Sequence, residues 1–335
     1  MSFMRRLLVI STLIIGLFPN HPSSAIETSS YKIAFNAPQG LVRGNPYHIF
    51  VMNPDGTGKK QITHGPFSCL CPTWSPDGRR IAFTSSKAGA SDIFVINLDG
   101  TGERNLTNTP DVYEYHPDWS PDGEKIAFDV AARAEEERGI WVLDLRSGER
   151  RRITDGCGPV WSPDGSRIAF IAPGNGGKSD IFICDEDGGG RINLTDHPGR
   201  DLDPSFTPDG RSIVFVSSRL GWGGYDLFLL DVETRRVKQV TKLAHLGLSA
   251  RCPDVSPDGR WIIFIAGKVG VDDPLNIYVV DITGKSLRRL TESPFSEFKP
   301  CWSPVPIGMG MKPSNKLLTL WGMLKMGLLN PKGGR

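Results

Sequence analysis

Short runs of β-branched and aromatic residues recur along the chain at a regular interval. The clearest run is a triplet of the Ile-Ala-Phe type, found at Ile81–Phe83, Ile126–Phe128, Ile168–Phe170, Ile213–Phe215 and Ile262–Phe264. A second apolar run follows each triplet, and a Leu-Thr or similar pair follows that run. Segments this short, separated by Gly, Pro, Asn and Asp, predict β-strands rather than helices.

A Trp-Ser-Pro-Asp-Gly motif precedes each triplet and sets the period of the repeat. Its copies are Trp74–Gly78, Trp119–Gly123 and Trp161–Gly165, with variants at Phe206–Gly210 and Val255–Gly259 and a truncated copy at Trp302–Pro304. The lead positions lie 42 to 49 residues apart. This period suits four short strands with their turns, which is the content of one propeller blade.

The repeat predicts an all-β fold, a six-bladed β-propeller of four-stranded antiparallel blades over residues 26–305. Before the first full motif, Ile33–Phe35, Ile49–Val51 and Ile62–Thr63 supply three strands of a blade that lacks its first strand. The segment near Trp302 supplies the missing strand. We therefore expect the ring to close by pairing this C-terminal strand with the N-terminal blade, which removes exposed sheet edges.

The motif residues have structural roles. Pro-Asp-Gly suits a tight turn, because proline fixes φ, aspartate bonds nearby backbone and glycine adopts positive φ. The tryptophans and the triplet phenylalanines are expected to fill the space between adjacent blades. Neither set is assigned any chemistry.

The two terminal segments fall outside the repeat. Residues 1–25 have the features of a signal peptide: Arg5 and Arg6, an apolar run from Leu7 to Phe18, and a small-residue cleavage site ending at Ala25. An uncleaved anchor is the alternative, but the run is short for a membrane span. Residues 306–335 form a cationic apolar tail with a predicted short helix, which either packs on the propeller, lies on a membrane surface or serves as a sorting tag.

Composition agrees with a folded, turn-rich exported domain. The chain is 39% hydrophobic and contains 38 Gly and 26 Pro. Removing residues 1–25 takes away two arginines and no acidic residue, so the formal charge of +2 falls to zero. A neutral chain gives no electrostatic reason to expect nucleic-acid binding.

The Trp-Ser-Pro-Asp-Gly, Ile-Ala-Phe and Leu-Thr series resembles the WD-like propeller repeat of the TolB family, over essentially residues 30–305. That family is a periplasmic scaffold whose propeller binds a peptidoglycan-associated lipoprotein, so the resemblance implies protein binding in the periplasm. TolB has an additional N-terminal domain that communicates with inner-membrane partners. Here the repeats begin within a few residues of the predicted signal peptide, so the resemblance is to the propeller alone.

Strand direction divides the predicted propeller into two faces. The Pro-Asp-Gly turns share one face, and the dissimilar loops between strands two and three and between blades share the other, which we call the loop face. The residue before each first-strand proline should encircle the channel mouth: Cys71, His116, Gly158, Asp203, Cys252 and Lys299. The residues two positions earlier should also lie at the mouth: Cys69, Glu114, Gly156, Asp201, Ala250 and Glu297. Cys, His and acidic residues can bind metal, but a solvated polar rim is favoured because no short-spaced ligand motif is present.

No catalytic motif is recognisable, and we predict no catalytic residue, metal or cofactor. His64, His116, His197 and His245 fall in connections between blades. They leave open an alternative function, a metal-dependent or carbohydrate-active lyase or hydrolase at the channel mouth, similar to the oligogalacturonate lyase type. Peptidases of the prolyl oligopeptidase type are excluded, because no hydrolase domain fits and no Gly-x-Ser-x-Gly motif occurs.

Six cysteines in an exported chain permit disulfides. Cys301, in the closing strand, lies in the blade between those of Cys71 and Cys252. We hypothesise that a bond from Cys301 to either of these neighbours staples the ring.

The sequence therefore predicts a non-enzymatic binding or scaffold propeller of the cell envelope, periplasmic or extracellular. It is expected to be a monomer that engages a protein or peptide through its loop face and does not bind nucleic acid. Contact with a membrane surface is expected only through the C-terminal tail. The candidate contact residues are Tyr113, Glu114, His116, Asp203 and Trp222.

Overall fold

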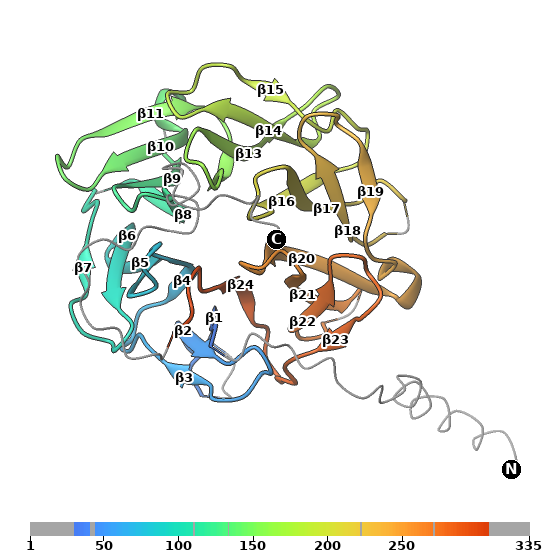
Figure 1. The fold of residues 1–335 in the computed structure, drawn as a ribbon. Coiled ribbons are helices and arrows are strands. Elements are labelled where there is room, and N and C mark those ends of the chain that lie inside the picture. Colours follow the sequence, from blue (N-terminus) through green and yellow to red (C-terminus); the bar gives the residue numbers. More distant parts are fainter. Residues whose placement is uncertain are drawn as a thin grey trace, which may run out of the picture.

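The computed structural model describes residues 30–40, 44–109, 111–132, 134–221, 223–270 and 272–307. In this part of the chain, six four-stranded sheets are arranged as blades around a central axis (Figure 1). The predicted all-β, six-bladed propeller is confirmed. The predicted signal peptide and almost all of the predicted tail lie outside the described residues.

The blades follow one another along the chain. We number them 1 to 6 and give their strands from the channel outward. Blade 1 contains β24 (Phe298–Trp302), β1 (Ile33–Pro38), β2 (Tyr47–Met52) and β3 (Lys60–Gln61). Blade 2 contains β4 (Cys69–Trp74), β5 (Arg80–Ala88), β6 (Ala90–Asn97) and β7 (Arg104–Asn105). Blade 3 contains β8 (Tyr113–Trp119), β9 (Lys125–Ala131), β10 (Gly139–Asp144) and β11 (Arg150–Thr154).

The second half of the ring repeats this order. Blade 4 contains β12 (Cys157–Trp161), β13 (Arg167–Pro173), β14 (Ser179–Asp185) and β15 (Ile192–Asn193). Blade 5 contains β16 (Asp201–Phe206), β17 (Ser212–Ser217), β18 (Asp226–Asp231) and β19 (Val237–Gln239). Blade 6 contains β20 (Leu248–Val255), β21 (Trp261–Lys268), β22 (Asn276–Asp281) and β23 (Arg288–Arg289). Two single-turn helices, η1 (Glu135–Glu137) and η2 (Ala244–Leu246), lie in loops.

The ring closes in blade 1, as the sequence predicts. Strand β24 pairs antiparallel with β1, with Ile33 opposite Trp302 and Ala34 opposite Cys301. Beyond the pair, the Lys32 backbone N–H donates to the Ser303 hydroxyl at 2.9 Å, and the Ser303 N–H donates to the Lys32 carbonyl at 2.8 Å. These bonds join segments at the two ends of the propeller into one sheet.

The Pro-Asp-Gly segments form the turns between the first and second strands. In blade 2, Gly78 has a φ of 67° and its N–H donates to the Ser75 carbonyl at 2.8 Å. The Asp77 carboxylate accepts from the Arg79 N–H at 3.0 Å, and the Ser75 hydroxyl accepts from the Arg80 N–H at 3.0 Å. Side-chain acceptors thus satisfy the backbone of the turn, which is the role expected of this motif.

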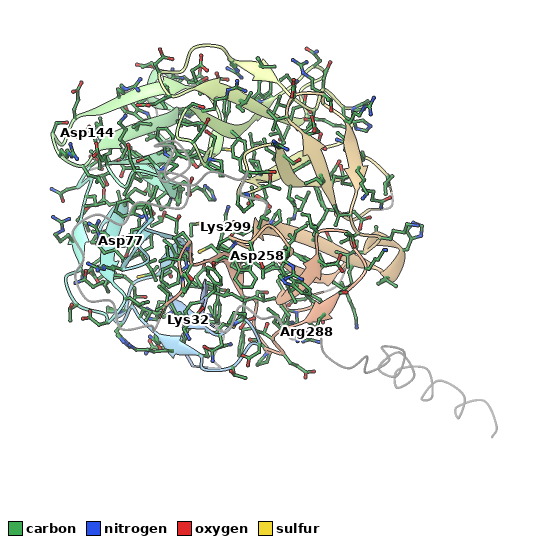
Figure 2. All side chains as sticks on the ribbon, in the orientation of Figure 1. Lys32, Asp77, Asp144, Asp258, Arg288 and Lys299 are labelled. Atoms are coloured by element: carbon green, nitrogen blue, oxygen red, sulfur yellow. The ribbon has the colours of Figure 1, made fainter. Side chains whose placement is uncertain are left out.

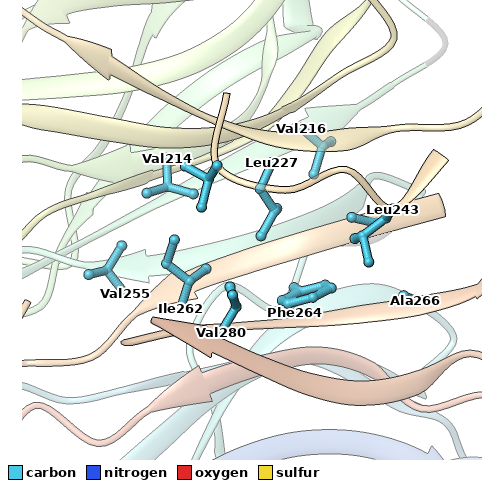
Figure 3. Close-up of a cluster of buried hydrophobic side chains, with 11 residues drawn as sticks. Val214, Val216, Leu227, Leu243, Val255, Ile262, Phe264, Ala266 and Val280 are labelled. Carbon is cyan, nitrogen blue, oxygen red and sulfur yellow. The ribbon is translucent and has the colours of Figure 1, made fainter. Parts of the chain in front are cut away.

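The core consists of separate clusters between neighbouring blades. Ala34 and Ile49 of blade 1 pack with Trp74, Ile81 and Phe83 of blade 2. Figure 3 shows the corresponding cluster between blades 5 and 6, with labelled side chains from both. Burying one such Phe or Ile contributes about 1.5–3 kcal/mol. The interpretation of the motif aromatics as inter-blade packing is confirmed.

No helix in the described residues is long and apolar enough to cross a membrane.

Candidate functional site

A β-bulge interrupts the innermost strand of every blade. In blade 2 the register between β4 and β5 shifts between Leu70 and Thr73. Each bulge holds one residue with positive φ: Cys71 (52°), His116 (50°), Gly158 (61°), Asp203 (53°), Cys252 (49°) and Lys299 (48°). Only one of the six is glycine, although this backbone region is costly for other residues. Such bulges re-aim side chains, here at six equivalent places around the axis.

Five of these six bulge residues line a central cavity of about 400 Å³. Asp203 is the one that does not. The proline after each bulge residue also lines the cavity, as do motif residues such as Trp74, Pro76 and Trp119, so the cavity extends toward the Pro-Asp-Gly face. Figure 2 shows Lys299 at the centre of the ring, while Asp144 lies at its outer rim.

The acidic residues two positions before the bulge residues were expected at the channel mouth, but they lie inside the blades. Glu114, Asp201 and Glu297 are fully buried within the blades rather than at the channel mouth. The bulge is the physical reason, because it breaks the alternation that would place residues i and i+2 on the same side of a strand. Glu114 accepts hydrogen bonds from Thr109 at 3.1 Å and from Arg150 at 3.2 Å, and burial raises the pKa of its carboxyl.

The four candidate contact residues that the structure describes lie in different settings. Tyr113 is half exposed at the start of β8, and the His116 ring is 38% exposed to the channel. Glu114 is buried beneath them. The Asp203 carboxylate accepts from the Cys252 N–H at 2.9 Å and so joins blade 5 to blade 6. Trp222 lies outside the described residues.

Two aspartates that the sequence analysis did not select stand on the channel wall. Asp118 of blade 3 accepts from the Thr73 hydroxyl of blade 2 at 3.2 Å and from the Trp161 N–H of blade 4 at 2.8 Å. Burial is the main reason that the pKa of Asp118 is raised to about 7. Each of the two carboxylate oxygens thus accepts a hydrogen bond from a different neighbouring blade.

Asp254 of blade 6 has the same arrangement on the opposite side of the ring. It accepts from the Ser205 hydroxyl of blade 5 at 3.1 Å and from the Trp302 N–H of blade 1 at 2.7 Å. Burial raises its pKa to about 6. Asp118 connects blades 2, 3 and 4, and Asp254 connects blades 5, 6 and 1, so the two aspartates together cover the ring.

Asp129 is a further residue that the sequence analysis missed. It lies in β9, and its Oδ1 contacts the Nδ1 of His116 at 2.8 Å and accepts from the Gly158 N–H at 2.9 Å. The position directly after the triplet phenylalanine is apolar in blades 4 to 6, where it holds Ile171, Val216 and Ile265. A charged residue at a strand position that is apolar in half of the blades is the signal that could have found it.

Among the described residues, the cysteines form no disulfide and the acidic residues form no metal cluster. All six cysteines are free. The hypothesis of a staple from Cys301 is not supported, and the Cys301 thiol instead donates to the Pro72 carbonyl at 3.2 Å. Within the described part of the chain, no group of three or more His, Cys, Asp or Glu residues is placed to hold a metal ion.

A groove of about 830 Å³ opens on the loop face where blades 6, 1 and 2 meet. Its lining comes from the strand two–three loops and the inter-blade connections. It includes five prolines (Pro38, Pro46, Pro66, Pro274 and Pro294), the aromatic residues Tyr47, Phe67 and Phe295, and the serines Ser68, Ser86 and Ser296. Phe67 is 39% exposed there. The groove thus offers apolar, aromatic and hydrogen-bonding groups together.

The closed ring of six blades defines a six-bladed β-propeller, with a groove on its loop face. Residues 27–172 and 156–304 match the family described as the TolB beta propeller domain. The chain belongs to this family, which confirms the resemblance found in the sequence.

Individual relatives support the same family. The Tol-Pal system protein TolB of Bordetella pertussis is 31% identical over 182 residues, which is 54% of this chain and 32% of that protein. The Tol-Pal system protein TolB of Wolinella succinogenes is 37% identical over 84 residues, 24% of this chain and 20% of that protein. The chain thus matches about a third or less of the length of these relatives.

Solved structures share the fold. TolB from Acinetobacter baumannii superposes with a TM-score of 0.71 at 21% identity, covering 83% of this chain and 68% of that one. An oligogalacturonate lyase in complex with manganese gives a TM-score of 0.55 at 19% identity, covering 78% and 74%. At these identities the likeness shows the propeller fold.

Proposed function

We propose that this chain is an exported, non-enzymatic binding propeller of the cell envelope that recognises a segment of a partner protein on its loop face. Membership of the TolB propeller family is the observation that carries the proposal. The relatives named as Tol-Pal system proteins support an envelope role, and the predicted signal peptide supports a periplasmic or extracellular location.

The groove on the loop face is where we place the partner. Prolines and aromatic rings supply rigid apolar contact area at little entropic cost, and the serines supply hydrogen bonds that orient a bound backbone. Tyr113, half exposed in neighbouring blade 3, extends the aromatic character of this face. Tyrosines that combine a large ring with a hydroxyl are frequent binding hot spots.

Capture from envelope extract on the immobilised protein tests the proposal. The variants Phe67→Ser and Tyr113→Ser each remove one exposed aromatic ring from the loop face. We expect a captured envelope protein whose apparent affinity falls about tenfold or more in at least one variant. Ile192→Ser is the matched control, because Ile192 (41% exposed) is about as exposed as Phe67 (39%) but lies on the outer strand β15.

Two outcomes would refute the proposal. Capture that depends on Ile192 and not on the loop-face rings would place binding on the outer rim. Stoichiometric metal in the purified protein, with lyase activity lost in His116→Ala or His197→Ala, would favour the competing carbohydrate-active enzyme, which shares the fold at a TM-score of 0.55.

A further inference from the structure

A thiol, an imidazole and a carboxylate lie in contact on the channel wall. Cys71 comes from β4 of blade 2, and His116 and Asp129 come from β8 and β9 of blade 3. The His116 ring interacts with the Cys71 thiol on one side and with the Asp129 carboxylate on the other. This order of groups is the one that activates cysteine nucleophiles in proteins.

The imidazole is held in a fixed orientation. Its Nδ1 lies 2.8 Å from Asp129 Oδ1, and the same oxygen accepts from the Gly158 N–H at 2.9 Å. The backbone of blade 4 therefore orients the carboxylate, and the carboxylate orients the ring. With Nδ1 engaged, the second ring nitrogen is left for the Cys71 thiol.

Cys71 is itself fixed and accessible. Its N–H donates to Asn36 Oδ1 of blade 1 at 3.2 Å, and its φ of 52° belongs to the bulge. Both Cys71 and His116 line the central cavity of about 400 Å³, and the His116 ring is 38% exposed. Cys71 is itself partly exposed, so the cavity gives a small molecule a route to the Cys71–His116 pair.

The charges around Cys71 favour a thiolate. Burial by itself raises the pKa of the Cys71 thiol, but His116 and the nearby Lys299 ammonium outweigh burial and lower it. Burial by itself lowers the pKa of His116, but Cys71 and Asp129 outweigh this effect and raise it. The charged groups that act on the pair are thus Lys299 and Asp129. The neighbouring Cys252 thiol has a raised pKa, mainly because of burial, and Cys71 contributes to that rise.

Cys71 is the cysteine whose thiol pKa is lowered, whereas the thiol pKa values of the other five cysteines are raised. Burial is the main cause that raises the pKa values of Cys69, Cys157, Cys184, Cys252 and Cys301. Cys157 is the informative comparison, because its side chain is exposed. Partial desolvation at the channel wall and the carboxylates of Asp129 and Asp203 still raise its pKa to about 11. If exposure decided reactivity, Cys157 would react first; if the tendency to form a thiolate decides it, Cys71 reacts first.

We propose that Cys71 is a covalent modification site at which a small-molecule disulfide entering the channel exchanges with a thiolate paired to His116. The Cys71 sulfur attacks one sulfur of the disulfide, a new S–S bond forms as the old one breaks, and the second half leaves as a thiolate. Cys71 is oxidised to the disulfide level while the leaving half is reduced. The leaving thiolate takes the proton from the His116 imidazolium and departs as a thiol.

The test is the rate of thiol exchange of the native protein with dithiodipyridine, which releases a coloured thione. We expect one fast phase equal to one thiol, mapped to Cys71 by mass spectrometry of the quenched adduct. The fast phase should be absent in Cys71→Ser and unchanged in Cys157→Ser. A fast phase that maps to Cys157, or to several cysteines, would overturn the proposal.

A pH profile separates activation by His116 from a merely structural role. In His116→Gln the thiol loses its cationic partner, so we expect the rate at about pH 6 to fall at least about tenfold while the rates at about pH 10 become similar. Asp129→Asn should give a smaller loss at about pH 6, because the asparagine oxygen can still accept from the His116 ring while only the negative charge is removed. Equal loss at both pH values would indicate damage to the channel, and an unchanged profile would show that Cys71 is an ordinary thiol.

Discussion

Replacing Asp118 by asparagine should change how the stability of the propeller depends on pH. The asparagine side chain is nearly isosteric, and its carbonyl oxygen can still accept from the Trp161 N–H, which now lies 2.8 Å from the carboxylate. The Thr73 hydroxyl can rotate to accept from the new amide. The substitution therefore removes titration while keeping the links between blades 2, 3 and 4.

The size of the effect follows from the pKa of Asp118, which burial raises from 3.8 to about 7 in the folded protein. Between these values the folded state binds a proton that the unfolded state has released. The wild type is thus fully stabilised below about pH 4 and loses stability as the pH rises to about 7. A shift of about 3 pH units corresponds to about 4 kcal/mol at 1.36 kcal/mol per unit.

Urea unfolding at a series of pH values measures this difference. The free energy of unfolding of Asp118→Asn minus that of the wild type should rise by about 4 kcal/mol between about pH 4 and about pH 8. Asp99→Asn is the control of opposite sign, because Thr101 lowers the pKa of this exposed carboxyl and its contribution is lost as the pH falls. A difference between Asp118→Asn and wild type that stays constant across the series would refute the reasoning.

Two further predictions concern stability and are checked by the same unfolding assay. Gly139→Ala should destabilise the protein by more than about 3 kcal/mol, because a Cβ there would lie 2.2 Å from the Thr154 carbonyl oxygen at a φ of 130°. Gly148→Ala is the control: no atom lies near its Cβ, so it should cost only the strain of a positive φ, about 1–2 kcal/mol. Equal losses of stability in the Gly139 and Gly148 variants would contradict the steric argument. Arg219→Ala should lower the free energy of unfolding by about 3–5 kcal/mol, because it leaves the buried Asp201 carboxylate without the guanidinium that lies 3.0 Å away. An exposed surface ion pair contributes only about 0–1 kcal/mol, so a loss in that lower range would contradict the prediction.

The blades could be predicted from the sequence because their signals are local and repeated. Each Ile-Ala-Phe triplet has the composition of a buried strand, and each Pro-Asp-Gly segment has the composition of a turn. The partial first unit and the leftover Trp302 also imply ring closure. All of these elements lie where the repeat places them.

The candidate site was harder to predict because it depends on the bulges. Half of the bulge residues, Cys71, Cys252 and Lys299, are of types that rarely adopt positive φ, so their identity gives no warning. The following proline was a usable signal, because proline inside a sheet is found at bulges. The ion pairs of Glu114 and Asp201 could not be inferred, since their partners Arg150 and Arg219 occupy positions that do not correspond between blades.

The pairing of β24 with β1 sets an order of events during biosynthesis. Lys32 and Ser303 are 271 residues apart in sequence, and closing a loop of this length costs about 5 kcal/mol of chain entropy. Until Trp302 has been synthesised, blade 1 has no innermost strand, and β1 presents an unpaired edge to other chains. The interval between translation of the first blade and arrival of its last strand is therefore when this protein is most exposed to aggregation.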